Sequence, residues 1–238
     1  MADKTALQAA ALAWNNPNES MESIELRIHD GFPLSELERR GDIYVHGMFA
    51  KFPYLQPHND WQIMEVGSGV GYIMQALARD LEKRKLTGYK IIGLDIAEHM
   101  LAKARERIGG DPHYDFLHYD GLTVPRPDAS LDFIYSIAAI QHIPKIYVYN
   151  LFFEFKRLLK PNGFAAIHYL PFTDLKKQSE HIPWRDEVTR QINNVPSHWH
   201  HFYSVEELEC VLRDGTGFAH VEARPDGMVC FGPTKPRR

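Results

Sequence analysis

A glycine-rich turn at positions 67 to 71 separates an apolar segment from a helix-like one. Ile63, Met64 and Val66 before the turn are apolar, as in a buried strand, and Tyr72 to Lys85 after it has the pattern of a helix. This strand–turn–helix order places a ligand at a helix N-terminus, and glycine permits a close approach that a Cβ would block. A dinucleotide site of the form G-x-G-x-x-G needs a third glycine at position 72, where this chain has tyrosine. The pattern is instead E-x-G-x-G-x-G, formed by Glu65, Gly67, Gly69 and Gly71.

Strand-like and helix-like segments alternate after this turn. The expected strands are Ile91 to Leu94, Phe116 to Tyr119, Leu131 to Ser136 and Phe164 to Tyr169, and the clearest helix is Glu98 to Ile108. Such alternation predicts right-handed crossovers and a parallel sheet. The second strand ends in Asp95, and a carboxylate at this place can accept two hydrogen bonds from a ribose diol. The stretch from Leu122 to Ala129 has two prolines and no helical pattern, which predicts a loop.

This order of motifs resembles that of the class I S-adenosylmethionine (SAM)-dependent methyltransferases, in particular their type 11 branch of small-molecule enzymes. The resemblance covers about residues 60 to 170. It implies an α/β fold with a doubly wound, mostly parallel seven-stranded sheet, an antiparallel last strand and an N-terminal helical lid. It also implies SAM as the cofactor and S-adenosylhomocysteine as its product.

The resemblance implies a cofactor-binding role for several residues. Glu65 would contact the methionine ammonium, and Asp95 would bind the ribose hydroxyls. Ile96 and Met100 would pack against adenine, Asp120 would accept its exocyclic amine, and Gly121 would let the ring approach. The remaining expected cofactor-binding residues are Gly67, Ser68, Gly69, Gly71 and Ser136.

Histidines are the candidates for catalysis. Methyl transfer is an in-line displacement at an activated carbon, so the protein mainly holds the acceptor in line. An oxygen or nitrogen acceptor that carries a proton also needs a base, and histidine suits this task at neutral pH. His142 is the first candidate, His168 the second, and His200 or His201 the third. The alternative for each is a structural role, such as bracing a loop.

No metal site is expected. His198, His200 and His201 lie close together, but no cysteine or glutamate accompanies them at ligand spacing. Family members that use a divalent ion hold it through oxygen ligands, which suit a hard cation. We therefore interpret this cluster as a polar wall for the acceptor.

The chain is expected to form one methyltransferase domain over residues 1–238, with four parts. Residues 1–60 would be a helical lid and acceptor wall, with helices at Ala6 to Trp14, Met21 to Ile28 and Ile43 to Phe52 and a short turn at Glu36 to Arg40. Residues 61–170 would be the SAM-binding core, 171–203 an acceptor-side insertion and 204–232 the sheet-closing segment. Trp14, Tyr44, His46 and Phe49 are the lid residues that could reach the active site or, alternatively, pack the lid onto the sheet.

Composition narrows the class of partner. The net charge is −4 and the isoelectric point about 6.3, whereas a dedicated nucleic-acid binder usually has a basic excess. Two cysteines form no disulfide framework, which favours a reduced cytoplasmic protein. No apolar run reaches the roughly 18 residues of a membrane span, and the N-terminal Ala/Leu run is too short and broken for a signal peptide.

The leading hypothesis is methyl transfer to a small molecule, with O-methylation of a hydroxylated metabolite or sugar and a histidine base. The alternatives are N-methylation of a small amine, or a SAM-binding protein without catalysis. An RNA or protein methyltransferase is less favoured, because the chain has no Asn-Pro-Pro-Tyr-like motif and no basic surplus. The glycine spacing argues against a dehydrogenase.

Overall fold

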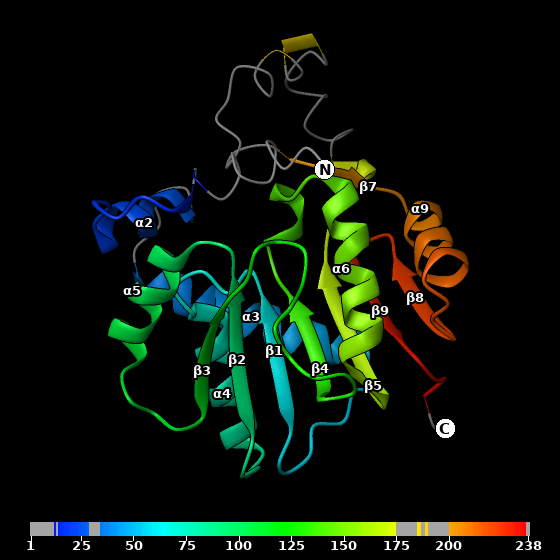
Figure 1. The fold of residues 1–238 in the computed structure, drawn as a ribbon, viewed down its shortest axis with the longest axis horizontal. Helices are drawn as coiled ribbons and strands as arrows, with labels where there is room; N and C mark the ends of the chain where they lie inside the picture. Colours follow the sequence, from blue (N-terminus) through cyan, green and yellow to red (C-terminus); the bar gives the residue numbers. More distant parts are fainter. Residues whose placement is uncertain are drawn as a thin grey trace.

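A seven-stranded sheet forms the centre of the protein (Figure 1). The computed structural model describes residues 12, 14–28, 34–174, 185–186, 189 and 200–236, without the side chains of 25–28 and 34–35. The strand order is β3-β2-β1-β4-β5-β9-β8. The order reverses between β1 and β4, and ligands of open α/β sheets bind at such a switch point.

Five strands of the sheet are parallel and two at one edge complete it. The parallel strands are β1 (Gln62–Val66), β2 (Lys90–Asp95), β3 (Tyr114–His118), β4 (Leu131–Ser136) and β5 (Leu159–His168). The last strand, β9 (Met228–Gly232), runs antiparallel to both β5 and the edge strand β8 (His220–Arg224). This arrangement confirms the predicted fold class, including the antiparallel last strand. A separate two-residue pairing joins β6 (Leu170–Pro171) to β7 (Phe202–Tyr203).

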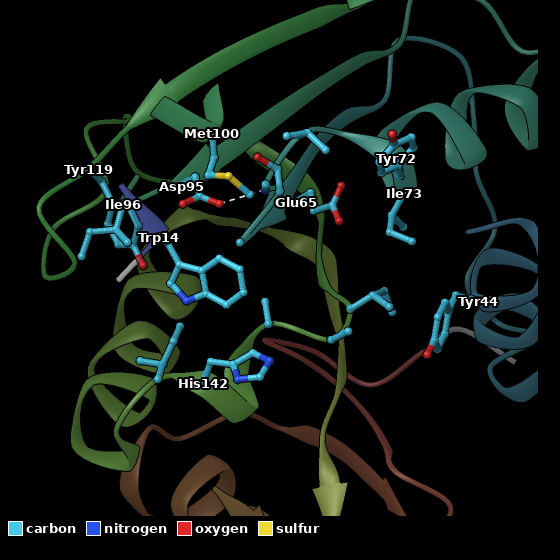
Figure 2. Close-up of a pocket in the computed structure, with 18 of the residues that line it drawn as sticks. Trp14, Tyr44, Glu65, Tyr72, Ile73, Asp95, Ile96, Met100, Tyr119 and His142 are labelled. Atoms are coloured by element: carbon cyan, nitrogen blue, oxygen red, sulfur yellow. Dashed lines mark hydrogen bonds between the residues drawn. The ribbon is translucent and has the colours of Figure 1, made fainter. Parts of the chain in front are cut away.

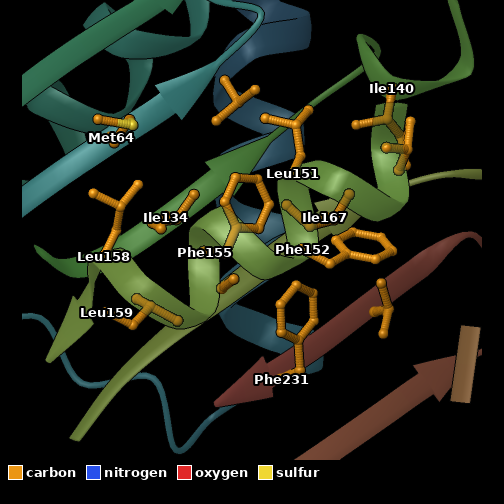
Figure 3. Packing of buried hydrophobic residues seen from close by; sticks show 14 of the residues in the cluster. Met64, Ile134, Ile140, Leu151, Phe152, Phe155, Leu158, Leu159, Ile167 and Phe231 are labelled. Atoms are coloured by element: carbon orange, nitrogen blue, oxygen red, sulfur yellow. The ribbon is translucent and has the colours of Figure 1, made fainter. Parts of the chain in front are cut away.

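One face of the sheet is covered by α6 (Lys145–Leu158), and Figure 3 shows the phenylalanines at this contact. Phe152 and Phe155 of α6 are fully buried and both pack against Phe231 of β9, with ring centroids 5.5 and 6.3 Å apart. Apolar side chains on alternate positions of β1, β2, β4 and β5 complete this half of the core. Burial of such side chains is the main stabilising term of the fold.

The opposite face is covered by α3 (Leu34–Lys51) and α4 (Tyr72–Lys83). The expected division into a short turn at Glu36 to Arg40 and a separate helix at Ile43 to Phe52 is wrong, because the structure has one continuous helix there. Gly41 lies where α3 meets α4, and a Cβ at this glycine would lie 3.1 Å from the Cβ of Ala76, so the glycine allows a close helix crossing rather than a break. Phe49 packs in the core against Trp61 and Phe133, and His46 is exposed. Neither of these two lid candidates reaches the site.

Three further helices of the described residues lie beside the sheet. They are α2 (Met21–Ile28), α5 (Glu98–Ile108) and α9 (Val205–Cys210), which continues as a π-helical turn over Val211–Gly215. The Ser204 hydroxyl caps α9 by accepting the N–H of Glu207 at 3.1 Å. The Glu207 carboxylate accepts hydrogen bonds from the Lys145 ammonium at 2.7 and 2.8 Å. None of the helices in the described ranges combines the length and apolarity that a membrane crossing needs. Cys210 and Cys230 are both free thiols.

Candidate cofactor and active site

A cavity of about 320 Å³ opens at the carboxyl ends of β1, β2 and β4, where the strand order reverses (Figure 2). Its size lies at the lower end of the range of ~300–1,000 Å³ that is usual for ligand sites. Its lining includes the expected residues Glu65, Gly67, Ser68, Gly69, Asp95, Ile96, Met100 and His142. Eight residues that the sequence singled out therefore lie around one cavity.

The glycine turn has a conformation that few other residues adopt. Gly67, Gly69 and Gly71 have φ values of +73°, +51° and +83°, in the left-handed region. A Cβ at Gly67 would lie 2.4 Å from the Cβ of Ala139, in the loop after β4. Gly67 thus lets the β4 loop close against the β1 loop. Gly71 directly precedes α4 and does not line the cavity.

Asp95 fixes this turn from the end of β2. Its two carboxylate oxygens accept backbone N–H bonds, Oδ2 from Gly69 at 2.8 Å and Oδ1 from Ala97 at 2.9 Å. Burial raises the pKa of the Asp95 carboxyl, and the backbone hydrogen bonds oppose that rise. Because each carboxylate oxygen can accept more than one bond, ligand hydroxyls can be bound in addition.

Glu65 is the second carboxyl of the cavity. Glu65 is only 1% exposed, and its Oε2 accepts a hydrogen bond from the Tyr135 hydroxyl at 3.0 Å. Burial raises the pKa of Glu65 well above its ordinary value, and nearby Asp95 raises it further. A cationic ligand group would be attracted to this place.

Apolar and aromatic side chains form the rest of the cavity. Ile96, Met100 and Tyr119 lie on the side of Asp95, and the Trp14 indole lies between this group and His142 (Figure 2). The Ser68 hydroxyl is buried in the lining and has no hydrogen-bond partner among the described residues. Two carboxylates, an apolar slot and an unsatisfied hydroxyl fit a ligand with an ammonium, a ribose and a flat apolar ring, as SAM has.

Four of the expected cofactor residues do not line the cavity. Besides Gly71 they are Ser136, Asp120 and Gly121. The Ser136 hydroxyl donates to the carbonyl of Val66 at 2.8 Å and ties β4 to β1. Asp120 is exposed, and its Oδ1 accepts the N–H groups of residues 122 and 123, both at 2.9 Å, within a turn. The neighbouring residue Tyr119 lines the cavity instead of Asp120.

The candidate histidines His142, His168 and His200 differ in their position relative to the cavity. His142 lines the cavity at the end of a 3-10 turn, Ile140–His142. His200 packs beside it, with ring centroids 5.2 Å apart. His168 lies outside the lining, edge-on to Tyr44 at 5.8 Å, and burial lowers its pKa to about 4. His142 is therefore the one of the three that faces the cavity directly.

Two segments were expected to contact the acceptor, the lid at residues 1–60 and the insertion at residues 171–203. Trp14 and Tyr44, two of the proposed lid residues, do line the cavity. His181, Trp184, His198 and Trp199, all within the expected acceptor-side insertion, lie outside the described residues. Within the described ranges, no group of three or more histidine, cysteine or carboxylate side chains could hold a metal ion.

Sequence reasoning missed several lining residues. Arg40 comes from the middle of α3, where a turn had been expected, and Ala138 has a φ of +54° in the loop after β4. An alanine carries no local signal for the left-handed conformation. Only the packing of that loop against the glycine turn reveals its place.

Comparison with known proteins agrees with the geometry. Residues 64–167 match the family model described as "Methyltransferase domain". A sterol 24-C-methyltransferase of Gibberella zeae is 32% identical over 117 residues, which are 48% of this chain and 29% of the relative. A 2-methyl-6-phytyl-1,4-hydroquinone methyltransferase of Synechocystis is 27% identical over 140 residues, 57% of this chain and 40% of the relative.

A solved structure extends the likeness in fold. The CMeT domain of the citrinin polyketide synthase superposes with a TM-score of 0.62, at 18% identity, over 91% of this chain and 58% of that one. At this identity the likeness concerns the fold alone. The chain spans less than half the length of the two curated relatives.

Proposed function

This chain belongs to the class I SAM-dependent methyltransferases, and from that premise we propose that it transfers the methyl group of SAM to a small-molecule acceptor. The observation that carries the proposal is the single cavity in which Glu65, Asp95 and the glycine turn meet His142. When bound, SAM supplies a methyl group already activated by its positively charged sulfur. The protein then has to hold the two reactants in line and exclude competing water.

The binding side of the cavity is formed by β1, β2 and the helices that follow them. The Asp95 carboxylate, held by the N–H groups of Gly69 and Ala97, would accept the ribose hydroxyls. Ile96 and Met100 offer an apolar surface to the adenine ring, and Glu65 offers a carboxyl to the ammonium group. Gly67 keeps the loop after β4 close enough to form the opposite wall.

His142 is the proposed general base. It lies in the lining, after β4, at the carboxyl edge where ligands of such sheets gather. For a hydroxylated acceptor, an imidazole nitrogen of His142 would take the hydroxyl proton while the oxygen attacks the methyl carbon. His200 contacts the His142 ring and would help to orient it. His168 is the weaker candidate, because a side chain whose pKa is about 4 accepts protons poorly at neutral pH.

A row of rings favours an apolar or aromatic acceptor over a sugar. Trp14 contacts His142, His142 contacts His200, and His200 contacts Phe202, with centroids 5.8, 5.2 and 6.4 Å apart. Phe202 in turn lies 6.3 Å from Phe172, which is 48% exposed. The row leads from the cavity to the surface, and flat rings stack or pack favourably on such a wall.

This row also makes carbon methylation the second candidate. The two curated relatives are named for a sterol and for a substituted hydroquinone, and both of these are largely apolar molecules that carry a hydroxyl. A hydroxylated ring can react at oxygen or at ring carbon, and a base that removes the hydroxyl proton assists both. N-methylation of a small amine and SAM binding without catalysis remain the other hypotheses.

Two measurements test the proposal. Calorimetry should show binding of SAM and of S-adenosylhomocysteine and no binding of NAD. Transfer from SAM carrying an isotopically labelled methyl group should then be assayed against a hydroquinone, a sterol, a sugar and an amine, with the product site located by NMR. Tight NAD binding without a response to SAM would overturn the proposal, and SAM binding without transfer to any acceptor class would favour a non-catalytic role.

A further inference from the structure

Glu65 and Tyr135 form a side-chain pair across two neighbouring parallel strands. They are register partners on β1 and β4, and both residues are almost completely buried. The Tyr135 hydroxyl donates to Glu65 Oε2 at 3.0 Å. Glu65 lines the cavity, whereas Tyr135 does not, so Tyr135 can act on a ligand only through Glu65.

On its other side, Glu65 lies next to a glycine of the neighbouring strand. Gly93 on β2 is the second register partner of Glu65. A Cβ at this glycine would lie 2.7 Å from both the Met74 sulfur and the Ser68 hydroxyl. Glu65 is thus held from one side by a tyrosine and bordered on the other by a position without a side chain.

The Glu65 carboxyl lacks a cationic partner in the described part of the chain. No Lys, Arg or His nitrogen described there lies within the 4.0 Å of an ion pair with it. The Glu65 carboxylate accepts a hydrogen bond from Tyr135, the backbone N–H of Met74 opposes the rise of its pKa, and Asp95 adds a second negative charge nearby. The other titratable side chains around the cavity come from α3, α4 and the segments after β3 and β4, and they are Arg40, Tyr44, Tyr72, Tyr119 and His142. The Arg40 guanidinium is hydrogen-bonded to Glu36 at 3.1 Å.

A buried carboxyl in such surroundings favours its neutral form, because a charge without a counter-charge is costly to bury. We propose that Tyr135 is a positioning residue for cofactor binding, and that Glu65 gives up a proton to solvent when its carboxylate pairs with the ammonium group of SAM. The Tyr135 hydroxyl donates to the carboxylate that forms and so makes its ionisation easier. This inference rests on the proposed function.

The wild-type protein alone gives the first test. Calorimetric titration with S-adenosylhomocysteine in two buffers of different ionisation enthalpy measures the protons released on binding. We expect release of up to one proton at pH 6 to 7, with affinity rising by up to about tenfold per pH unit in that range. Measurable binding that releases no proton would overturn the inference and leave the proposed function intact. Failure to bind at any pH would overturn the proposed function, and this inference with it.

Tyr135→Phe gives the second test. Removing the hydroxyl deprives the ionised carboxylate of a donor, so affinity at pH 7 should fall about tenfold. The deficit should shrink as the pH rises, because at high pH Glu65 is ionised before binding in both proteins. Glu65→Gln should bind without releasing a proton. Tyr169→Phe is the matched control, since Tyr169 is also fully buried and its hydroxyl donates to the Arg224 carbonyl away from the cavity. A Tyr135→Phe protein whose deficit is the same at every pH would show a merely structural role and refute the inference.

Discussion

The carboxylate of Asp95 accepts a hydrogen bond from the backbone N–H of Gly69 at 2.8 Å, so the end of β2 fixes the turn that follows β1. A second bond, from Ala97 at 2.9 Å, fixes the start of the segment that leads into α5. One side chain therefore shapes both loops of the proposed cofactor site. The same carboxylate is also the proposed acceptor for the ribose hydroxyls.

Asp95→Ala should weaken SAM binding by at least about tenfold. Hydrogen bonds to a charged group contribute about 1.5–3 kcal/mol, and the variant loses those to the ligand as well as those that shape the loops. Calorimetry with S-adenosylhomocysteine measures the change. Asp111→Ala is the matched control, because Asp111 also accepts a backbone N–H, from His113 at 2.8 Å, but is exposed and outside the cavity. An unchanged dissociation constant for folded Asp95→Ala would remove Asp95 from the site.

Gly67→Ala should lower both stability and cofactor affinity. The new Cβ would lie 2.4 Å from the Cβ of Ala139, at a φ of +73°. A non-glycine residue in the left-handed region costs about 1–3 kcal/mol, and the contact forces the loop after β4 to move. At about 2–4 °C per kcal/mol for a domain of this size, Tm should fall by several degrees. Gly110→Ala should change neither property, because a Cβ there has open space and its φ is not in the left-handed region. Equal Tm values for the two variants would contradict the close approach of the two loops.

Local sequence patterns predicted most of the core strands and helices, because strands, turns and helix ends depend on neighbouring residues. The strand Leu131 to Ser136 and the helix Glu98 to Ile108 have the predicted bounds. The strand expected at Phe164 to Tyr169 begins earlier in the structure, at Leu159. Leu159 joins the strand because it pairs with Leu131 of β4, a long-range contact that the local sequence does not reveal.

The opposite wall of the cavity depends on packing between segments far apart in the chain. Arg40 and Tyr44 reach it because α3 is one helix that lies along α4, and Gly41 allows that contact without any local sign of it. Asp120 was expected at the cavity but does not line it. A loop aspartate after a strand can bind a ligand or stabilise a turn, and here its Oδ1 accepts backbone N–H groups of the turn. The sequence specified the residue types at the strand ends, whereas tertiary contacts decide which of them line the cavity.

The partly buried His168 should make the protein less stable as the pH falls. Burial lowers its pKa in the folded protein to about 4, against 6.5 for an ordinary histidine. Between these values the unfolded chain binds a proton that the folded protein does not, so the free energy of unfolding decreases as pH falls from about 6.5 to about 4. The full difference corresponds to roughly 3 kcal/mol at 1.36 kcal/mol per pKa unit. His168→Phe keeps a ring against Tyr44 and should flatten this dependence in urea unfolding at pH 7, 5.5 and 4.5. His46→Phe, at an exposed position of α3, should leave the dependence as in the wild type.

His142→Ala should lower kcat by about 10² to 10⁴, the usual contribution of a general base. SAM affinity should stay close to that of the wild type, because the proposed cofactor contacts come from β1 and β2. The wild-type rate should fall at acid pH, where a protonated imidazole cannot accept a proton, and the remaining activity of His142→Ala should lose this dependence. Steady-state kinetics over a pH series, with the acceptor identified by the labelled-methyl assay, would measure both effects.

His168→Ala and His200→Ala, measured in parallel, separate the base from its neighbours. His200→Ala should cost less than His142→Ala, since His200 contacts the His142 ring from outside the lining. His168→Ala should affect stability more than kcat, because its imidazole is partly buried beside Tyr44. Near-wild-type turnover by His142→Ala together with loss in either of the other two would place the base elsewhere. Activity in all three would mean that orientation of the reactants carries the reaction and that the histidines shape the acceptor wall.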